Sequence, residues 1–252
     1  AELRSRDQAR DEPVLRWLAI EAAVVVGTAT ALLRPDQRRF LSFAGETTTI
    51  DPLVEAASGE LGEDVYASVD HRGSLATLRE CGFELEVASE EFEVRFDTVL
   101  AALRRARMPV GWSAVPAPDV DPQRLFALDN AIRSGIRGME GWRGNWAWFT
   151  DELTDPAAYL VAVANETDEY AGLARIWRNP TGPRFGLVGV TEANRGTGVG
   201  PGILRLALEE AALWGHDTFT AETGLENRHF HRRLRKLGSA SLRIRYQMVR
   251  KN

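Results

Sequence analysis

The residues of this chain that are best suited to chemistry form a glycine-rich run, Arg195-Gly196-Thr197-Gly198-Val199-Gly200. Glycine tolerates positive φ, so such a run can turn several amide hydrogens toward one point. An apolar stretch at 185–190 predicts a buried strand before the run, and Pro201 suits the first position of a helix after it. Because a helix N-terminus carries unpaired amides and the positive end of its dipole, the run predicts a phosphate site, with Arg195 adding charge.

Spacing excludes two common phosphate loops. A Walker loop requires Gly-Lys-Ser/Thr after four intervening residues, and no lysine follows these glycines. The dinucleotide pattern G-x-G-x-x-G would need a glycine at Pro201 or at Ile203. A glycine-rich turn that holds no ligand remains the plain structural alternative.

The run fits the R/Q-x-x-G-x-G/A signature of the GNAT superfamily of N-acetyltransferases, which the sequence therefore resembles. The resemblance implies an α/β fold of the α+β type, with a mixed central sheet flanked by helices, and acetyl-CoA as co-substrate. The glycine-rich loop would clasp the pyrophosphate, and main-chain groups of the preceding strand would bond the pantetheine arm. The cofactor-binding residues that it implies are Val188, Gly189, Val190, Arg195, Gly196, Thr197, Gly198, Val199, Gly200 and Asn227.

The elements after the run follow the order of this family. The helix that starts at Pro201 is expected to end at Gly215, residues 218–223 alternate as a strand, and Asn227 opens a second helix. In GNAT enzymes an asparagine stands eleven residues ahead of a Gly-Phe pair, and Asn227 stands eleven ahead of Gly238, where Ser239 replaces the phenylalanine. Asn227 as a helix cap alone and as a cap that also contacts the cofactor remain equal alternatives.

The resemblance implies acetyl transfer to the primary amine of a small molecule. Glu222, or else Glu192, could deprotonate the amine through a water molecule, although a surface carboxylate is the commoner role for either. Many GNAT members protonate the leaving thiolate with a tyrosine, but that position is Leu234 here. Tyr246 on the final strand could substitute, with simple packing as its alternative, or water could suffice.

Two functions from other classes compete with catalysis. The missing tyrosine and the altered Gly-Phe pair fit a regulatory or scaffold protein that binds acetyl-CoA, and the loop alone fits a plain nucleotide binder. No metal site is expected, because His229 and His231 lie two apart on a helix and face different ways.

The chain contains a degenerate internal repeat. Strands expected at 14–21, 22–34 and 38–45 correspond to strands at 159–165, 171–178 and 184–190. Downstream, both copies share marks at equal offsets: His71-Arg72, Leu78-Arg79 and Gly82 in the first, and Asn227-Arg228, Leu234-Arg235 and Gly238 in the second. The sequence therefore predicts two GNAT-like repeats.

We expect a degenerate first domain at 1–97, a connector helix at 98–110 and an acetyl-CoA-binding domain at 111–252. The first domain lacks a glycine cluster and places Glu46 and Asp51 where phosphate would sit, although its Cys81-Gly82-Phe83 keeps the Gly-Phe ending. It is therefore expected to be structural or to shape the substrate site.

In the second domain, a helix capped by Asp121 and a helix at 145–153 are expected beside the substrate groove. Aromatic and sulfur-containing residues between and within them could wall an acceptor pocket, or could be core. These residues are Met139, Trp142, Trp146, Trp148 and Phe149. A short charged helix is expected at 1–12.

Composition narrows the setting. A net charge of −5 without a basic patch argues against nucleic acid as a partner, and the longest apolar run, 18–33, is interrupted and too short to span a membrane. A single cysteine, Cys81, and the lack of a leader favour the cytoplasm. The oligomeric state is left open between a monomer and a homodimer.

Overall fold

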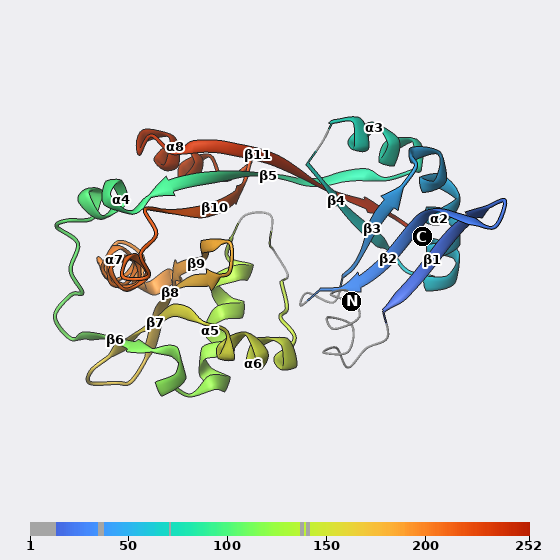
Figure 1. The fold of residues 1–252 in the computed structure, drawn as a ribbon. Helices are drawn as coiled ribbons and strands as arrows, with labels where there is room; N and C mark the ends of the chain where they lie inside the picture. Colours follow the sequence, from blue (N-terminus) through green and yellow to red (C-terminus); the bar gives the residue numbers. More distant parts are fainter. Residues whose placement is uncertain (1–13, 35–37, 71, 137–138, 140–141) are drawn as a thin grey trace. The chain divides into compact units, whose positions relative to one another are not determined.

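The chain forms two compact units in a computed structural model that describes residues 14–34, 38–70, 72–136, 139 and 142–252 (Figure 1). The first unit comprises Ala1–Ala88 and Ile244–Asn252, and the second comprises Ser89–Arg243. The short helix expected at 1–12 and the repeat mark His71 lie outside the described residues.

The first unit combines a mixed sheet with helices. Antiparallel pairing joins β1 to β2 and β2 to β3, β3 runs parallel to β4, and the end of β11 pairs antiparallel with β4. Its elements are β1 (Leu15–Glu21), β2 (Val24–Leu33), β3 (Arg39–Gly45), η1 (Thr47–Thr49), α2 (Ile50–Leu61), β4 (Val65–Val69), α3 (Arg72–Glu80) and part of β11 (Ala240–Arg250).

The second unit contains the glycine-rich run and has its strands in the order β5-β10-β9-β8-β7-β6. Only the β9–β10 pair in this order is parallel. The strands are β5 (Glu84–Arg95), β6 (Trp112–Pro116), β7 (Ala157–Ala164), β8 (Tyr170–Asn179), β9 (Gly182–Val190) and β10 (Thr218–Gly224). The helices are α4 (Phe96–Ala102), η2 (Ala117–Asp119), α5 (Pro122–Ser134), α6 (Trp146–Thr154), η3 (Glu192–Asn194), α7 (Val199–Ala212) and α8 (Arg228–Lys236).

Strand alternation gives the second unit two apolar layers, one on each face of its sheet. In β7, Ala158, Leu160 and Ala162 join the core cluster that contains buried residues of α7. Tyr159 and Val161 alternate with them and join the cluster beneath α5 and α6. Because successive side chains of a strand point to opposite faces, helices cover both sides of this sheet, and the fold is mixed α/β as expected.

The internal repeat is visible in the order of elements but not in the way they pair. The order β1-β2-β3-α2-β4-α3-β5 recurs as β7-β8-β9-α7-β10-α8-β11. The last strands are exchanged: β5 pairs with β10 of the second repeat, and β11 pairs with β4 of the first. Each compact unit therefore takes a strand from the other repeat, and the unit bounds differ from the contiguous segments 1–97 and 111–252.

Two other expectations differ from the structure in their bounds. The helix expected over the connector 98–110 is α4, which ends at Ala102. The helix α7 begins at Val199 rather than at Pro201, which is its third residue. A proline is tolerated there because the first amides of a helix have no acceptor within the helix.

The turn between β3 and α2, which corresponds to the glycine-rich run of the second repeat, is filled by its own residues. Thr49 donates from its hydroxyl to the Glu46 carbonyl at 2.7 Å. A Cβ placed on Gly27 would lie 2.1 Å from that same hydroxyl oxygen, and one on Gly45 would lie 2.3 Å from the Val26 carbonyl oxygen. The backbone here is packed against β2, which fits the expectation of a structural role.

Gly202 provides a test of how closely α7 packs. A Cβ at this position would lie 2.7 Å from the carbonyl oxygen of Arg107, a backbone atom that cannot move without shifting the chain. We expect Gly202→Ala to lower the free energy of unfolding by about 1–3 kcal/mol, because overpacking strains the contact. Urea denaturation of the full chain measures the change.

Gly59 in α2 is the matched control, since a Cβ there meets nothing within 4 Å. Gly59→Ala is expected to raise the free energy of unfolding by about 0.5–1 kcal/mol through helix propensity alone. Equal effects of the two substitutions would contradict the close packing of α7 on residue 107.

Candidate functional site

The turn between β9 and α7 is held in shape by its polar side chains. Asn194 donates from its side-chain amide to the Thr191 hydroxyl at 2.9 Å, and Thr197 donates from its hydroxyl to the Asn194 carbonyl at 2.8 Å. Gly196 and Gly198 have φ of 79° and 93°, the left-handed region that glycine adopts at least cost. These two glycines let the chain reverse into α7 within a few residues.

Several amides of this turn lack protein acceptors. Within the described part of the chain, the amides of Gly196, Thr197, Gly198 and Gly200 donate to no protein atom, and the first helical bond runs from Gly202 to Gly198 at 3.1 Å. A Cβ on Gly196 would meet nothing within 4 Å, so the space beside the turn is open. Unpaired amides at the head of a helix form a site for an anion.

Arg195 brings a positive charge to the same place. Its side chain is exposed, and Nη2 lies 3.5 Å from where a Cβ on Gly135 would be, beside the C-terminal end of α5. The carbonyl end of a helix favours a cation, so α5 helps to position this guanidinium. No carboxylate among the described residues pairs with it.

The edge of β9 that faces β10 is largely unpaired. On its other edge β9 pairs with β8 from Gly182 to Val190, whereas its pairing with β10 consists of Arg184 opposite Thr220. Beyond that point, main-chain groups of residues 185–190 on the β10 side have no strand partner among the described residues. Val188, Gly189 and Val190 therefore lie on a stretch whose backbone can bond a ligand.

Packing explains why position 189 is a glycine, which the sequence did not reveal. A Cβ at this position would lie 2.2 Å from Cγ2 of Ile132, which projects from α5. Glycine is therefore required for the close packing of α5 on β9, whether or not a ligand approaches the strand.

Glu222 lies on β10 two residues beyond the pair that joins β10 to β9. Ser89 donates from its hydroxyl to Oε1 of Glu222 at 2.5 Å, and Arg184 donates from Nη2 to Oε2 at 3.1 Å. The Glu222 side chain is 19% exposed. The carboxylate is thus held in place at the point where the two strands part.

Glu192 is exposed in η3, where its carbonyl accepts from the Arg195 amide.

A second carboxylate lies on the same face of the sheet as Glu222. Glu91 on β5 is directly opposite Glu222 in the antiparallel pair, and Arg243 donates to it from Nε at 2.5 Å. The alternate residues Phe92 and Ala221 belong to the core cluster of α7, so both carboxylates face the opposite side, the side of α5. This face combines carboxylates with their paired arginines.

Asn227 caps α8, and this cap is the one hydrogen bond that its side chain makes among the described residues. Its side-chain oxygen accepts from the Phe230 amide at 3.3 Å. The cap is thus observed, and a role in cofactor binding stays a prediction. Leu234, at the position of the family's tyrosine, is 4% exposed and packs in the core.

Tyr246, the proposed general acid, belongs to the first unit by itself. It is paired with Val69 of β4 and packs against the core cluster of that unit. It is therefore not part of the site formed by the second unit alone, and its catalytic role stays a prediction.

The aromatic residues near α5 and α6 divide between core and surface. Phe149 is 5% exposed and belongs to the core, whereas Trp146 is 41% exposed and stacks at 6.0 Å on Phe149. Trp142 is half-buried, with the Arg133 guanidinium 5.1 Å from its ring centre. Phe149 is thus a core residue, which was one of the two expectations. Trp146 has an exposed surface that a ligand can reach.

The sequence analysis did not identify several residues of this site. Ser89 and Arg184 orient Glu222, and Ser89 precedes it by more than a hundred positions in the chain. Only the exchanged strand β5 brings Ser89 beside β10, and strand pairing of this kind has no local signal.

Within the described ranges, no group of three or more His, Cys, Asp or Glu side chains is placed to hold a metal ion. None of the described helices has the length and apolar character needed to cross a membrane.

Comparisons with known proteins agree with this geometry. Residues 124–238 match the model of the Acetyltransferase (GNAT) family. No curated protein matches the sequence.

Among solved structures, the chain resembles a GCN5-related N-acetyltransferase from Sphaerobacter thermophilus, with 16% identity, a TM-score of 0.67, and coverage of 99% of this chain and 84% of that protein. It also resembles a tandem GNAT protein from the clavulanic acid biosynthesis pathway, with 15% identity, a TM-score of 0.70, and coverage of 94% and 82%. A GCN5-related N-acetyltransferase from Kribbella flavida matches with 12% identity, a TM-score of 0.61, and coverage of 100% and 94%.

The mixed sheet, the turn that leads into α7 and the parted strands β9 and β10 are features of an α/β fold that these solved structures share. The family model matches residues 124–238, slightly less than half of the chain, and the whole chain shares its fold with a tandem GNAT protein.

Asn227 offers a test that separates its two roles. We expect Asn227→Ala to lower the free energy of unfolding by about 0.5–2 kcal/mol, because the cap of α8 is lost. Asn227→Ser retains a capping oxygen and should leave stability within about 0.5 kcal/mol of the parent. Thermal or urea denaturation measures both variants. A stable Ser variant with weakened coenzyme A affinity would assign the side chain a contact with the cofactor as well.

Proposed function

We propose that this chain is an acetyl-CoA-dependent N-acetyltransferase that acts on the primary amine of a small molecule. The observation that carries the proposal is the set of unpaired amides of Gly196, Thr197, Gly198 and Gly200 at the head of α7, next to the largely unpaired edge of β9. The first repeat, whose corresponding turn is packed against its own sheet, is proposed to bind no acetyl-CoA.

The site fits the two ends of the co-substrate in different ways. The amides of the turn, together with Arg195, suit a diphosphate, because charge-assisted hydrogen bonds to phosphate are among the stronger ones. The free backbone of Val188, Gly189 and Val190 suits an extended amide-containing chain, which would add to the sheet as a strand does. The proposed cofactor-binding residues also include Thr197, Gly198, Val199 and Asn227.

The reaction needs a deprotonated amine at the thioester. Glu222, positioned by Ser89 and Arg184 where β9 and β10 part, is the proposed base, acting directly or through a water molecule. The amine nitrogen then bonds to the thioester carbon and loses one proton to solvent, the carbon–sulfur bond breaks, and the thiolate takes a proton. Tyr246 or water supplies that proton, because Leu234 has no hydroxyl.

Small amines are the proposed acceptors because the face beside the parted strands is lined by carboxylates. Glu222 and Glu91 face the same side, and their carboxylate oxygens can accept hydrogen bonds from an amine while Arg184 and Arg243 balance their charge. The exposed ring of Trp146 on α6 adds an apolar surface on the same side of the sheet.

Release of free thiol distinguishes catalysis from binding. The chain is incubated with acetyl-CoA and a panel of amines that includes polyamines, amino acids and aminoglycosides, and thiol is followed with a colorimetric reagent. We expect turnover with at least one amine. Tight binding of acetyl-CoA without turnover across the panel would favour the regulatory or scaffold alternative, and affinity for ATP that survives excess coenzyme A would favour a nucleotide binder.

The phosphate cradle is tested by two substitutions. Arg195→Glu should weaken coenzyme A binding by about 1–3 kcal/mol, through loss of a charge-assisted contact and added repulsion. Gly198→Val should weaken it at least as much, because valine strongly disfavours the positive φ of the N-cap. Isothermal titration calorimetry gives the dissociation constants.

Arg105→Glu, on an exposed turn after α4, is the matched charge control. Wild-type affinity in the Arg195 and Gly198 variants would place the diphosphate elsewhere. An equal loss in the Arg105 and Arg195 variants would point to long-range charge instead of the cradle.

The proton-transfer groups are tested with two nearly isosteric substitutions. Glu222→Gln should lower kcat by about 100-fold or more with a small change in KM, since a positioned base contributes about that much. Tyr246→Phe removes only a hydroxyl, and a tenfold or greater loss of kcat would support it as the acid, on the order expected for such a group. Glu93→Gln, on the exposed part of β5, serves as the control. Unchanged kcat in Glu222→Gln would remove Glu222 from the mechanism.

A further inference from the structure

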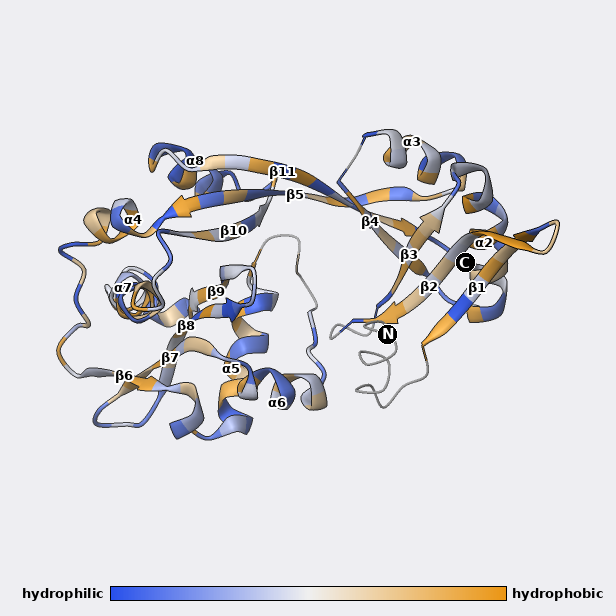
Figure 2. Cartoon of the chain, viewed as in Figure 1, coloured by the Kyte–Doolittle hydropathy of each residue, from blue (hydrophilic) through white to orange (hydrophobic). Residues whose placement is uncertain are grey.

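Helix α8 carries a concentration of positive charge that the proposed reaction does not use. Its nine residues include five arginine or lysine side chains and no acidic one, in a chain whose net charge is −5. Figure 2 shows α8 coloured largely as hydrophilic. The sequence analysis found no basic patch, and the structure corrects that expectation.

The helix separates its apolar and charged residues onto different faces. Phe230 and Leu234 pack into the core of the second unit, four residues apart on one side. Arg228, Arg232 and Lys236 follow one another at intervals of four on another side and are exposed. A row of like charges at this spacing weakens a helix by about 0.2–0.5 kcal/mol per pair unless an anion compensates it.

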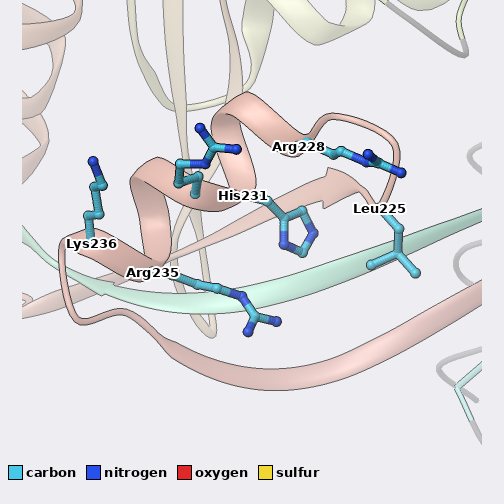
Figure 3. Close-up of a pocket in the computed structure, with 6 residues that line it drawn as sticks. Leu225, Arg228, His231, Arg235 and Lys236 are labelled. Atoms are coloured by element: carbon cyan, nitrogen blue, oxygen red, sulfur yellow. The ribbon is translucent and has the colours of Figure 1, made fainter.

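The charged face borders an open pocket of about 500 Å³. Figure 3 shows His231 and Arg235 directed to the same side of α8, with Leu225 beside them and Lys236 at the far end of the helix. The pocket is lined by Leu225, Arg228, His231, Arg232, Arg235 and Lys236. Leu225, in the turn before the helix, is 38% exposed and supplies the one apolar side chain of the lining.

One carboxylate neutralises part of this charge. Arg235 donates from Nη2 to Glu90 at 3.2 Å, and Nδ1 of His231 lies 3.4 Å from the same carboxylate. Burial favours a higher pKa for Glu90, but hydrogen bonds from Ser241 and Arg235, with nearby positive charge, hold it below its ordinary value. Glu90 is therefore an anion that orients Arg235 and His231 at the base of the pocket.

The rest of the charge is uncompensated. In the described part of the chain, the side chains of Arg228, Arg232 and Lys236 pair with no carboxylate. Nε2 of His231 is buried without a hydrogen-bond partner, in the wall of the same pocket. The exposed side chains of Arg228, Arg232 and Lys236, and not this buried atom, are therefore the groups that a ligand can reach.

We propose that this pocket binds a small polyphosphate anion, either an inorganic one or the phosphate chain of a nucleotide. Arg228 and Arg232 are separated by about 6 Å along the helix axis, and long guanidinium side chains at that spacing can converge on a compact polyphosphate. Guanidinium groups bind phosphate through paired hydrogen bonds, and Leu225 offers an apolar surface to an attached ring.

The pocket is distinct from the cradle between β9 and α7. The core residues Phe230 and Leu234 occupy the side of α8 that packs with the α7 cluster, and Phe230 lies 5.9 Å from Phe185 of β9. The charged face of α8 points away from that cluster, beside Glu90 of β5. One polyphosphate can therefore bind here while coenzyme A occupies the cradle.

The proposal is tested by titrating the full chain with inorganic tripolyphosphate at fixed ionic strength, in the presence of saturating coenzyme A. We expect one binding site per chain. The double variant Arg228→Gln with Arg232→Gln should raise the dissociation constant about tenfold or more, because two charge-assisted contacts are lost. The matched control, Arg104→Gln with Arg105→Gln, removes the same charge from an exposed turn and should change it less than about twofold.

Three results would overturn the proposal. The first is no binding of tripolyphosphate, or an equal loss in the double variant and its control. The second is a coenzyme A affinity that falls along with tripolyphosphate affinity in the Arg228 and Arg232 variant, which would make the pocket part of the coenzyme site. The third is binding of single-stranded RNA or an acidic peptide with no binding of tripolyphosphate. If coenzyme A does not bind, the titration with tripolyphosphate is repeated in the Gly198→Val variant, in which the cradle is disabled. Failure of the proposed function and failure of this proposal are then distinguished.

Discussion

The second unit depends on one constraint on strand β9. Its backbone pairs with β8 along the whole strand but with β10 at Arg184 alone, and at its end the chain must reverse into α7. Two glycines with positive φ, Gly196 and Gly198, make that reversal possible without the steric cost that a side chain would add. As a result, unpaired backbone groups occur both along the strand and at the head of the helix, and a ligand that spans the two can satisfy them together.

Helix α5 holds this arrangement from the other face of the sheet. Ile132 fills the space that a side chain at Gly189 would take, and the carbonyl end of the same helix lies beside the Arg195 guanidinium. The Asp121 cap, which accepts from the Arg124 amide at 2.9 Å, fixes where the helix begins. A single helix therefore contacts both the strand and the charge that follows it.

Local patterns predicted local structure well. The strand and the helix that flank the glycine-rich run, the caps at Asp121 and Asn227 and the strands of both repeats are confirmed, because each depends on residues close together in the chain. The exchange of β5 and β11 was not predicted, since partner choice between two similar repeats depends on packing far apart in sequence. The contacts of Glu222 follow from that exchange, so its partner Ser89 had no signal. The basic residues of α8 are visible in the sequence at 228–236, but the acidic net charge of the chain drew attention away from them.

Leu234, which replaces the family's tyrosine, lies on the apolar face of α8. Leu234 is buried among residues of the α7 cluster, where a hydroxyl would require a partner of its own. With leucine there, the inner face of the helix contributes only packing and the Asn227 cap, and its polar chemistry is confined to the outer face with Glu90, His231 and the arginines. In the proposed reaction the leaving thiolate takes its proton from another group or from water, which is feasible because a thiolate leaves readily without an acid. The charged residues of α8 thus lie on a different face from Leu234, the position of the family's catalytic tyrosine.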